Sequence, residues 1–332
     1  MFLKIKVINI LAVVFIVLLF ANITIETLND DEFIMKSFYP TQVKIEMKFN
    51  SALNEWGINE EWILTKSLKH PLDSLYYSYE VKIPLTVPIP FILSSVTEKF
   101  LNDETKIICK EKTINGITYL NIYADEIEKL RAEFKYDKNI LRESKEAAFL
   151  ITGFNDLDKP AKEKLLKGIE PFAAIIVPDK GSLIFCNQLN EHNKEYAVLL
   201  NDDIEYSRYS LNTDKNGVAL KKAVKMLSKD FSKAAVFIID KNSSVYKSAA
   251  FNFIMAEFSK YNKTLYSIER FISLPNRELL EVESLFKFHF ENQEISRKVF
   301  YLDCSTFNNL IPLFNKLRKQ GHRFVLPGSY YN

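Results

Sequence analysis

From residue 146 onwards, short apolar segments alternate with amphipathic segments of helical periodicity. The apolar segments, such as Phe149–Ile151 and Val236–Ile238, contain no polar alternation, which is typical of strands buried on both faces of a parallel sheet. About seven strand–helix units follow one another, which predicts an α/β barrel or a large doubly wound sheet. In both architectures functional residues lie at the carboxyl ends of the strands, so we look for chemistry there.

The expected boundaries follow from the apolar runs and the helical periodicity. The predicted strands are 147–151, 173–177, 197–200, 234–239, 264–266, 298–302 and 324–326. The predicted helices are 161–168, 218–228, 248–261, 276–287 and 307–320. Residues 146–332 are therefore expected to form one α/β domain.

The preceding part of the chain predicts a small α+β module over residues 76–145, including a linker. Its expected elements are a strand at 77–83, a helix at 91–101, and two strands at 107–111 and 117–123 around an Asn-Gly turn. The charged stretch 124–145 has a helical pattern and is predicted to be the linker. Residues 26–75 are interpreted as a spacer with some helix. Modules of this kind usually bind or orient rather than catalyse.

The first residues predict a membrane anchor. Lys4 and Lys6 precede an apolar run from Val7 to Ile25, which is just long enough to cross a bilayer core. The positive flank should stay in the cytoplasm, so the bulk of the chain is expected outside the inner (cytoplasmic) membrane, held by residues 1–25. A cleaved signal peptide with an apolar region at 7–20 is the competing interpretation, although Phe20-Ala21-Asn22 makes a poor cleavage site.

Composition excludes several classes of partner and cofactor. The 332 residues include 44 Lys and Arg against 42 Asp and Glu, so no basic excess points to nucleic acid. The chain has only 8 Gly and lacks both Gly-rich phosphate-binding motifs, so we expect no nucleotide cofactor. The three cysteines are far apart in apolar surroundings and are expected to be buried free thiols.

Polar residues follow the predicted strands, but histidine is scarce among them. The chain has 4 histidines, none placed at a strand carboxyl end, so the usual His and carboxylate set of a zinc hydrolase is missing. The best remaining cluster is the group of acids that follows the predicted strand 197–200. Together with the acid that follows the predicted strand 234–239, this group could hold a cation or serve as an acid/base pair. A solvated loop is the alternative that we favour. These acidic candidates are Asp202, Asp203, Glu205 and Asp240.

The order of these strand ends resembles the divergent polysaccharide deacetylase family, which is related to metal-dependent deacetylases of cell-wall sugars. The likeness covers about 185 residues and depends on spacing and strand context more than on identities. The segments that carry it are 149–153, 174–178, 199–206, 235–244, 266–270, 297–303 and 328–329.

This resemblance implies a deacetylase-like (β/α) barrel with its site at the strand carboxyl ends. At the positions where the family carries metal ligands, this chain has other residues: Thr152, Gly153, Asn201, Lys241 and Ser329. A lysine at a ligand position repels a metal cation, and an amide is a weak ligand at best. We therefore assign no catalytic residue, no metal and no cofactor.

Three functional hypotheses remain. The first is a membrane-anchored extracytoplasmic protein whose deacetylase-like cleft binds cell-wall glycan or an envelope protein without hydrolysing it. The second, which we rank next, is a purely structural envelope protein that serves as an interaction surface. The third is an active carbohydrate deacetylase whose metal ligands have moved to the acidic candidates.

Overall fold

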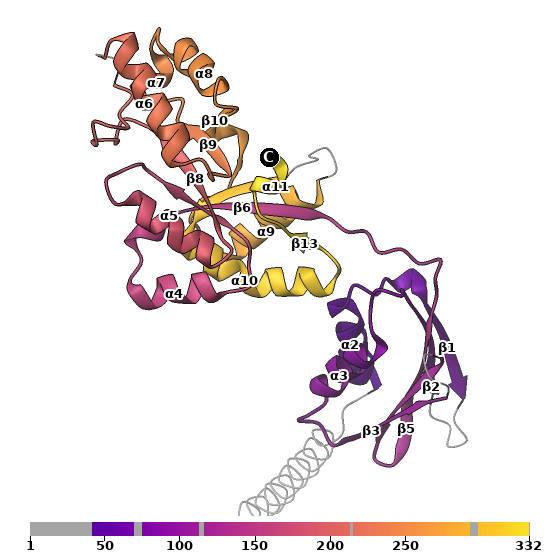
Figure 1. Cartoon of the computed structure of the whole chain (residues 1–332). Coiled ribbons are helices and arrows are strands. Elements are labelled where there is room, and N and C mark those ends of the chain that lie inside the picture. Colours follow the sequence, from indigo (N-terminus) through magenta and orange to yellow (C-terminus); the bar gives the residue numbers. More distant parts are fainter. Residues whose placement is uncertain (1–41, 70–74, 113–115, 213–214, 293–297, 332) are drawn as a thin grey trace, which may run out of the picture. The chain divides into compact units, whose positions relative to one another are not determined.

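The computed structural model describes residues 42–69, 75–112, 116–212, 215–292 and 298–331 (Figure 1). The chain divides into two units, and the boundary in the sequence lies between Arg142 and Glu143. The predicted anchor at 7–25 lies outside the described residues. Among the described helices, none has the length and apolar character that a membrane crossing requires.

The first unit has a five-stranded sheet with the order β1-β2-β5-β4-β3, in which only β2 and β5 pair in parallel. Its elements are α2 (Gln42–Glu55), β1 (Ile63–Lys69), β2 (Leu75–Ile83), α3 (Ile89–Lys99), β3 (Thr105–Glu111), β4 (Thr118–Ala124) and β5 (Ile127–Tyr136). Both helices lie on the same side of this sheet (Figure 1).

Helix α2 places Ile45, Phe49, Ala52 and Leu53 on one face, and these residues are fully buried. The Phe49 ring lies 5.0 Å from the ring of Tyr79 on β2. Because successive strand residues point to opposite faces, only alternate residues of each strand reach this core. The core of the first unit therefore lies between the helices and one face of the sheet. No described helix of this unit covers the second face, which we call the uncovered face.

Two interpretations of this part of the chain were wrong. The charged stretch 124–145 does not form a helical linker, because residues 127–136 form β5, a central strand between β2 and β4. The apolar residues of β5 fit a helix in part, but pairing on both edges decides in favour of a strand. The presumed spacer also supplies α2 and β1 to the core and the sheet.

The second unit contains the predicted parallel sheet, in the order β10-β9-β8-β7-β6-β12-β11, with β13 paired to the start of β6. Its strands are β6 (Glu146–Thr152), β7 (Ala173–Ile176), β8 (Glu195–Leu200), β9 (Val236–Ile239), β10 (Leu265–Ser267), β11 (Ile272–Ser273), β12 (Lys298–Asp303) and β13 (Arg323–Phe324). Its helices are α4 (Lys159–Lys167), α5 (Ser182–Glu191), α6 (Gly217–Asp230), α7 (Ser244–Lys247), α8 (Phe251–Ser259), α9 (Leu279–Glu291), α10 (Cys304–Lys319) and α11 (Gly328–Tyr331).

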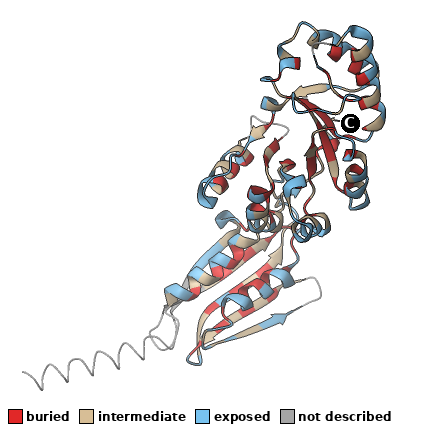
Figure 2. Cartoon of the chain, turned by 90° about the vertical axis from the view of Figure 1, so that its left-hand side faces the viewer, coloured by how far each residue is buried: buried red, intermediate tan, exposed pale blue. Residues whose placement is uncertain are grey.

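The strand order decides between the two predicted architectures. Read from β11 through β12 and β6 to β10, the strands follow the cyclic order of a singly wound barrel that is open between β10 and β11. The long helices α4, α5, α6, α8, α9 and α10 all contribute to one core cluster with Ala147, Phe149 and Ile151, so they cover a single face. The unit is thus an α/β, barrel-like fold and not a doubly wound sheet. In Figure 2 the strands of this unit are mostly buried.

The opposite, inner face of the sheet has its own core. Three alanines on neighbouring strands, Ala148, Ala173 and Ala197, leave room above the sheet. The rings of Tyr330 and Tyr331 and the side chain of Val325 pack there. The Tyr331 ring lies 4.9 Å from the ring of Tyr266 and 6.2 Å from the ring of Phe271. Tyr266 is on β10 and Phe271 directly precedes β11, the two outer strands of the sheet. The chain's own residues 325–331 therefore fill this side.

Candidate functional site

The parallel pairing brings the predicted polar residues to one edge of the sheet. Thr152 ends β6 and pairs in register with Asp303, the last residue of β12. Leu200 pairs with Ile239, so Asn201 and Asp240 are the next residues on two adjacent strands. Because all these strands run in the same direction, their carboxyl ends meet at the same edge. This edge is the first candidate site.

Thr152 and Gly153 have structural roles at this edge. The Thr152 hydroxyl donates to the Leu302 carbonyl at 3.5 Å, on the paired strand. Gly153 adopts φ +72°, in the left-handed region, and begins the 3₁₀ turn Phe154–Asp156. The glycine is needed for this turn, which leads Phe154 into the core.

The acidic residues after β8 are engaged in hydrogen bonds. Asn201 donates its amide N–H to the Asp203 carboxylate at 2.6 Å, within the loop. The Asp202 carboxylate accepts from the Ser244 backbone N–H at 2.8 Å and from its hydroxyl at 2.7 Å. These bonds from Ser244 hold the pKa of Asp202 below its usual value. Glu205 is exposed to solvent.

The residues after β9 follow the same pattern. The Asp240 carboxylate accepts from the Asn242 N–H at 2.7 Å, which closes a local turn. The Lys241 ammonium is 4.0 Å from the Glu269 carboxylate, and both side chains are largely exposed. A surface ion pair at this distance contributes little to stability.

Other carboxylates at the strand ends cap helices. Asp303 accepts from the Thr306 N–H at 2.9 Å and its hydroxyl at 2.8 Å, and so caps α10. Asp158 caps α4 through the Ala161 N–H at 2.8 Å. Asp179 accepts from the backbone N–H and the hydroxyl of Ser182, at the start of α5. The carboxylates of this edge mostly satisfy backbone N–H groups of the loops and helices that follow the strands.

In the part of the chain that the structure describes, no group of three or more His, Cys, Asp or Glu residues is arranged to hold a metal ion. The local bonds of Asp202 and Asp240 separate these two acids into different turns.

Ser329 lies in the last segment of the chain, after the short strand β13. Strand β13 pairs with Glu146 and Ala147, at the amino end of β6. The N–H of Gly328 then donates at 2.6 Å to the carboxylate of Glu195, which is the first residue of β8. The Ser329 hydroxyl donates to the Leu326 carbonyl at 2.7 Å, a local bond within this segment. Burial raises the pKa of Glu195, and the bond from Gly328 opposes this shift.

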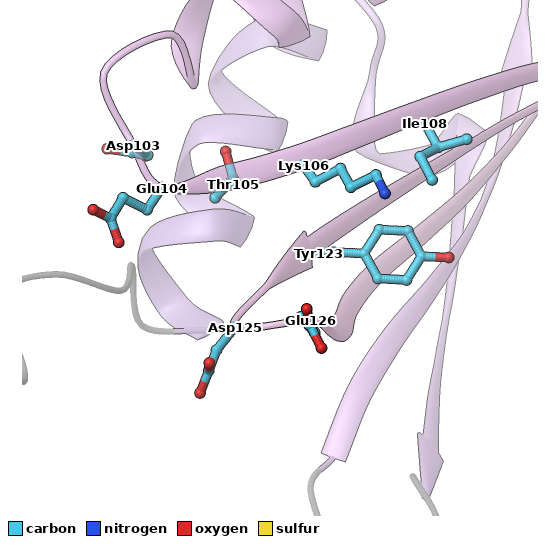
Figure 3. A pocket seen from close by; sticks show the side chains of 8 residues that line it. All are labelled: Asp103, Glu104, Thr105, Lys106, Ile108, Tyr123, Asp125 and Glu126. Atoms are coloured by element: carbon cyan, nitrogen blue, oxygen red, sulfur yellow. The ribbon is translucent and has the colours of Figure 1, made fainter.

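A second candidate site lies in the first unit, and the sequence interpretation missed it. A pocket of about 520 Å³ opens where β3 begins and β4 ends (Figure 3). Its lining residues are Asp103, Glu104, Thr105, Lys106, Ile108, Tyr123, Asp125 and Glu126. The available signal was the alternation Tyr119-x-Asn121-x-Tyr123 in a predicted strand, which places three polar or aromatic side chains on one face.

Comparisons with known proteins give a distant structural similarity. No protein-family model and no curated protein matches the chain. A solved structure, that of the uncharacterized protein ATU2773 from Agrobacterium tumefaciens C58, aligns with a TM-score of 0.38 and 8% sequence identity. The alignment covers 57% of this chain and 89% of that chain.

Proposed function

We propose that this chain is a cell-envelope protein that binds glycan without hydrolysing it. Residues 7–25 would hold it in the inner membrane, with the rest of the chain on the outer side. The second unit would be a deacetylase-like domain that has kept the barrel-like strand order and lost the hydrolytic centre. The resemblance of the strand ends to deacetylases and the cyclic strand order support this proposal.

The observation that carries the proposal is how the carboxyl edge uses its acids. Hydrolysis of an N-acetyl group needs a base or a metal-bound water near the acetyl carbon. Here Asp202 already accepts two hydrogen bonds from Ser244, and these lower its pKa and its basicity. Asp303 is likewise occupied by Thr306. Such carboxylates hold loops and helix starts in place instead of activating water.

The test uses the full chain, purified in detergent. We expect less than stoichiometric transition metal by elemental analysis and no acetate release from acetylated chitin or peptidoglycan fragments. We also expect measurable binding of those fragments by calorimetric titration.

One outcome would restore the relocated-ligand hypothesis: stoichiometric metal with acetate release that stops on chelation and in Asp240→Asn. Asp156→Asn, in the loop after β6, serves as the matched control for that substitution. A chain that neither binds glycan nor releases acetate would instead support the structural alternative, in which the ligand is a protein.

A further inference from the structure

The uncovered face of the first sheet carries a regular arrangement of polar and aromatic side chains. Along β4, Leu120, Ile122 and Ala124 are buried under the helices, whereas Tyr119, Asn121 and Tyr123 are half-buried on the other face. The alternation of red and tan along the strands of this unit is visible in Figure 2. The face is therefore neither an apolar surface nor a fully solvated one.

The strand register sets what lies beside each tyrosine. Tyr123 pairs with Lys106 on β3 and Glu128 on β5. Tyr119 pairs with Lys110 and Glu133 in the same way. Each ring thus lies between a cation and an anion. Such mixed charge does not favour a polyanion and is compatible with an uncharged ligand.

The pocket lies at the Tyr123 end of this face. Figure 3 shows Tyr123 and Lys106 side by side, with Ile108 further along β3. Asp125 and Glu126 form the two-residue turn between β4 and β5. The pocket has a volume of about 520 Å³, which is within the usual range for sites of small ligands. Asp103 is already bound to Lys48 at 2.6 Å, so the carboxylates left in the lining are those of Glu104, Asp125 and Glu126.

The lining groups match the two sides of a sugar ring. A pyranose has an apolar face of C–H groups, which packs on an aromatic ring, and a rim of hydroxyls. Tyr123 and Ile108 supply aromatic and aliphatic surface. The carboxylates of Asp125 and Glu126 can each accept hydrogen bonds from two hydroxyl groups, and the Lys106 ammonium can donate hydrogen bonds to hydroxyl oxygens.

We propose that this pocket binds one sugar ring of a glycan, with Tyr123 under the ring and Lys106, Asp125 and Glu126 on its hydroxyls. This inference rests on the proposed function, and it places the glycan in the first unit and not at the carboxyl edge of the barrel-like sheet. The Asn121 side chain donates to the Tyr123 hydroxyl at 3.3 Å and helps to orient the ring.

The first experiment titrates the full chain with chito-oligosaccharides, and in a second series with cello-oligosaccharides, which lack the acetamido group. We expect Tyr123→Ala to weaken binding about tenfold or more, because the ring surface is lost. Tyr123→Phe keeps that surface, so its affinity should stay within about threefold of the unmodified chain. Tyr119→Ala is the matched control: the same residue type on the same strand and face, outside the pocket, and we expect no change.

A second variant separates binding from folding. Glu126 and Asp125 adopt φ of 57° and 53°, in the left-handed region that glycine prefers, so Glu126→Gly removes a carboxylate while suiting the turn. We expect at least about fivefold weaker binding with an unchanged or raised melting temperature.

The results distinguish the two proposals. If the unmodified chain binds neither oligosaccharide, the proposed glycan function fails, and this inference fails with it. If it binds and Tyr123→Ala or Glu126→Gly has no effect, or Tyr119→Ala weakens binding equally, only the pocket assignment is overturned. A preference for chito- over cello-oligosaccharides would show that the acetamido group is also recognised.

Discussion

In the described part of the first unit, two helices cover one face of the sheet and no helix covers the other, whereas in the second unit both faces carry buried core residues. Helices bury one side of the parallel sheet, and residues 325–331 bury the inner side. The polar residues of the two sheets differ accordingly. In the first unit they stand on the uncovered face, and in the second they are concentrated in the loops at the strand ends.

This difference teaches where acidic side chains remain available to a ligand. Each strand-to-helix connection of the second unit leads to a helix whose first N–H groups need acceptors, and Asp158 and Asp303 supply them. The hairpin turn of the first unit leads from strand to strand, so Asp125 and Glu126 have no helix to cap. Asp125 and Glu126 of the first unit therefore differ from Asp158 and Asp303 of the second, whose carboxylates are engaged at helix starts.

The largest expected contrast concerns the cysteines. Cys109 is exposed on β3 of the first unit, so its predicted burial was wrong. Cys186 on α5 and Cys304 on α10 of the second unit are buried, as predicted. Burial raises the pKa of Cys186 and of Cys304 to about 12, so about 1 in 10,000 of these thiols is ionised at pH 8. We expect Cys109 to react with a thiol reagent in the native chain, and the other two to react over a thousandfold more slowly than a free thiol.

The labelled positions can be identified by mass spectrometry, with Cys109→Ser as the control that should abolish native labelling. Burial also raises the pKa of Cys109, so its labelling should be slower than that of an unhindered thiol. Equal native reactivity of all three cysteines would contradict the described burial of the second unit.

The next contrast concerns the core of the second unit. Phe149 is fully buried, and five other phenylalanine rings lie between 4.6 and 6.2 Å from its own. Phe149→Ala should lower the free energy of unfolding by about 3–5 kcal/mol, because it removes a large ring and leaves a cavity. Urea unfolding followed by far-UV circular dichroism measures this loss. Fluorescence of Trp56 and Trp62, the 2 tryptophans of the chain, reports on the first unit.

Phe288→Ala is the matched control for this prediction. Phe288 is on α9, in the same unit, and is 67% exposed. Its removal should change the free energy of unfolding by less than about 0.5 kcal/mol. Similar losses for the two variants would mean that the core is not where the structure places it.

A smaller effect tests the role of the acids at the carboxyl edge. Asp303→Ala removes the cap of α10 and should cost about 1 kcal/mol of stability, with no change in glycan affinity. Asp303→Asn keeps an acceptor for the Thr306 N–H, so its cost in stability should be only about a few tenths of a kcal/mol. Loss of glycan binding at unchanged stability would reverse the comparison between the two units, since it would make the edge a binding site.

Much of the second unit could be predicted from the sequence, because its strands are continuous apolar runs such as Phe149–Ile151. Burial on both faces leaves such a run few alternatives to a central parallel strand. Strand β5 could not be predicted in the same way. Its charged residues and its apolar residues fit either periodicity, and the choice depends on pairing with β2 and β4, which lie elsewhere in the sequence.

The same distinction between predictable and unpredictable features applies to the candidate sites. That Asn201 and Asp240 share an edge follows from their positions after parallel strands, and this was predictable. That Asp202 binds Ser244, 42 residues away, depends on the course of two loops, which no local pattern encodes. The pocket beside Tyr123 was missed for a related reason, because it depends on the register of β3 against β4.

The smallest predicted effect concerns the pH dependence of the Asp202 bond. Because Ser244 holds the pKa of Asp202 below its usual value, the ionised carboxylate stabilises the folded chain at neutral pH. That contribution is present above the usual aspartate pKa of about 4 and is lost as the pH falls through the lowered value.

Asp202→Asn should therefore lower the urea midpoint slightly at pH 6 and approach the unmodified chain at pH 2.5. The effect is small because the carboxylate is exposed and solvent screens it. Ser244→Ala, which removes the hydroxyl donor but keeps the N–H, should show part of the same pH dependence. A constant difference between Asp202→Asn and the unmodified chain over this pH range would mean that Asp202 acts through packing and not through its charge. The carboxyl edge would then owe its stability to something other than the acid–amide bonds that set it apart from the first unit.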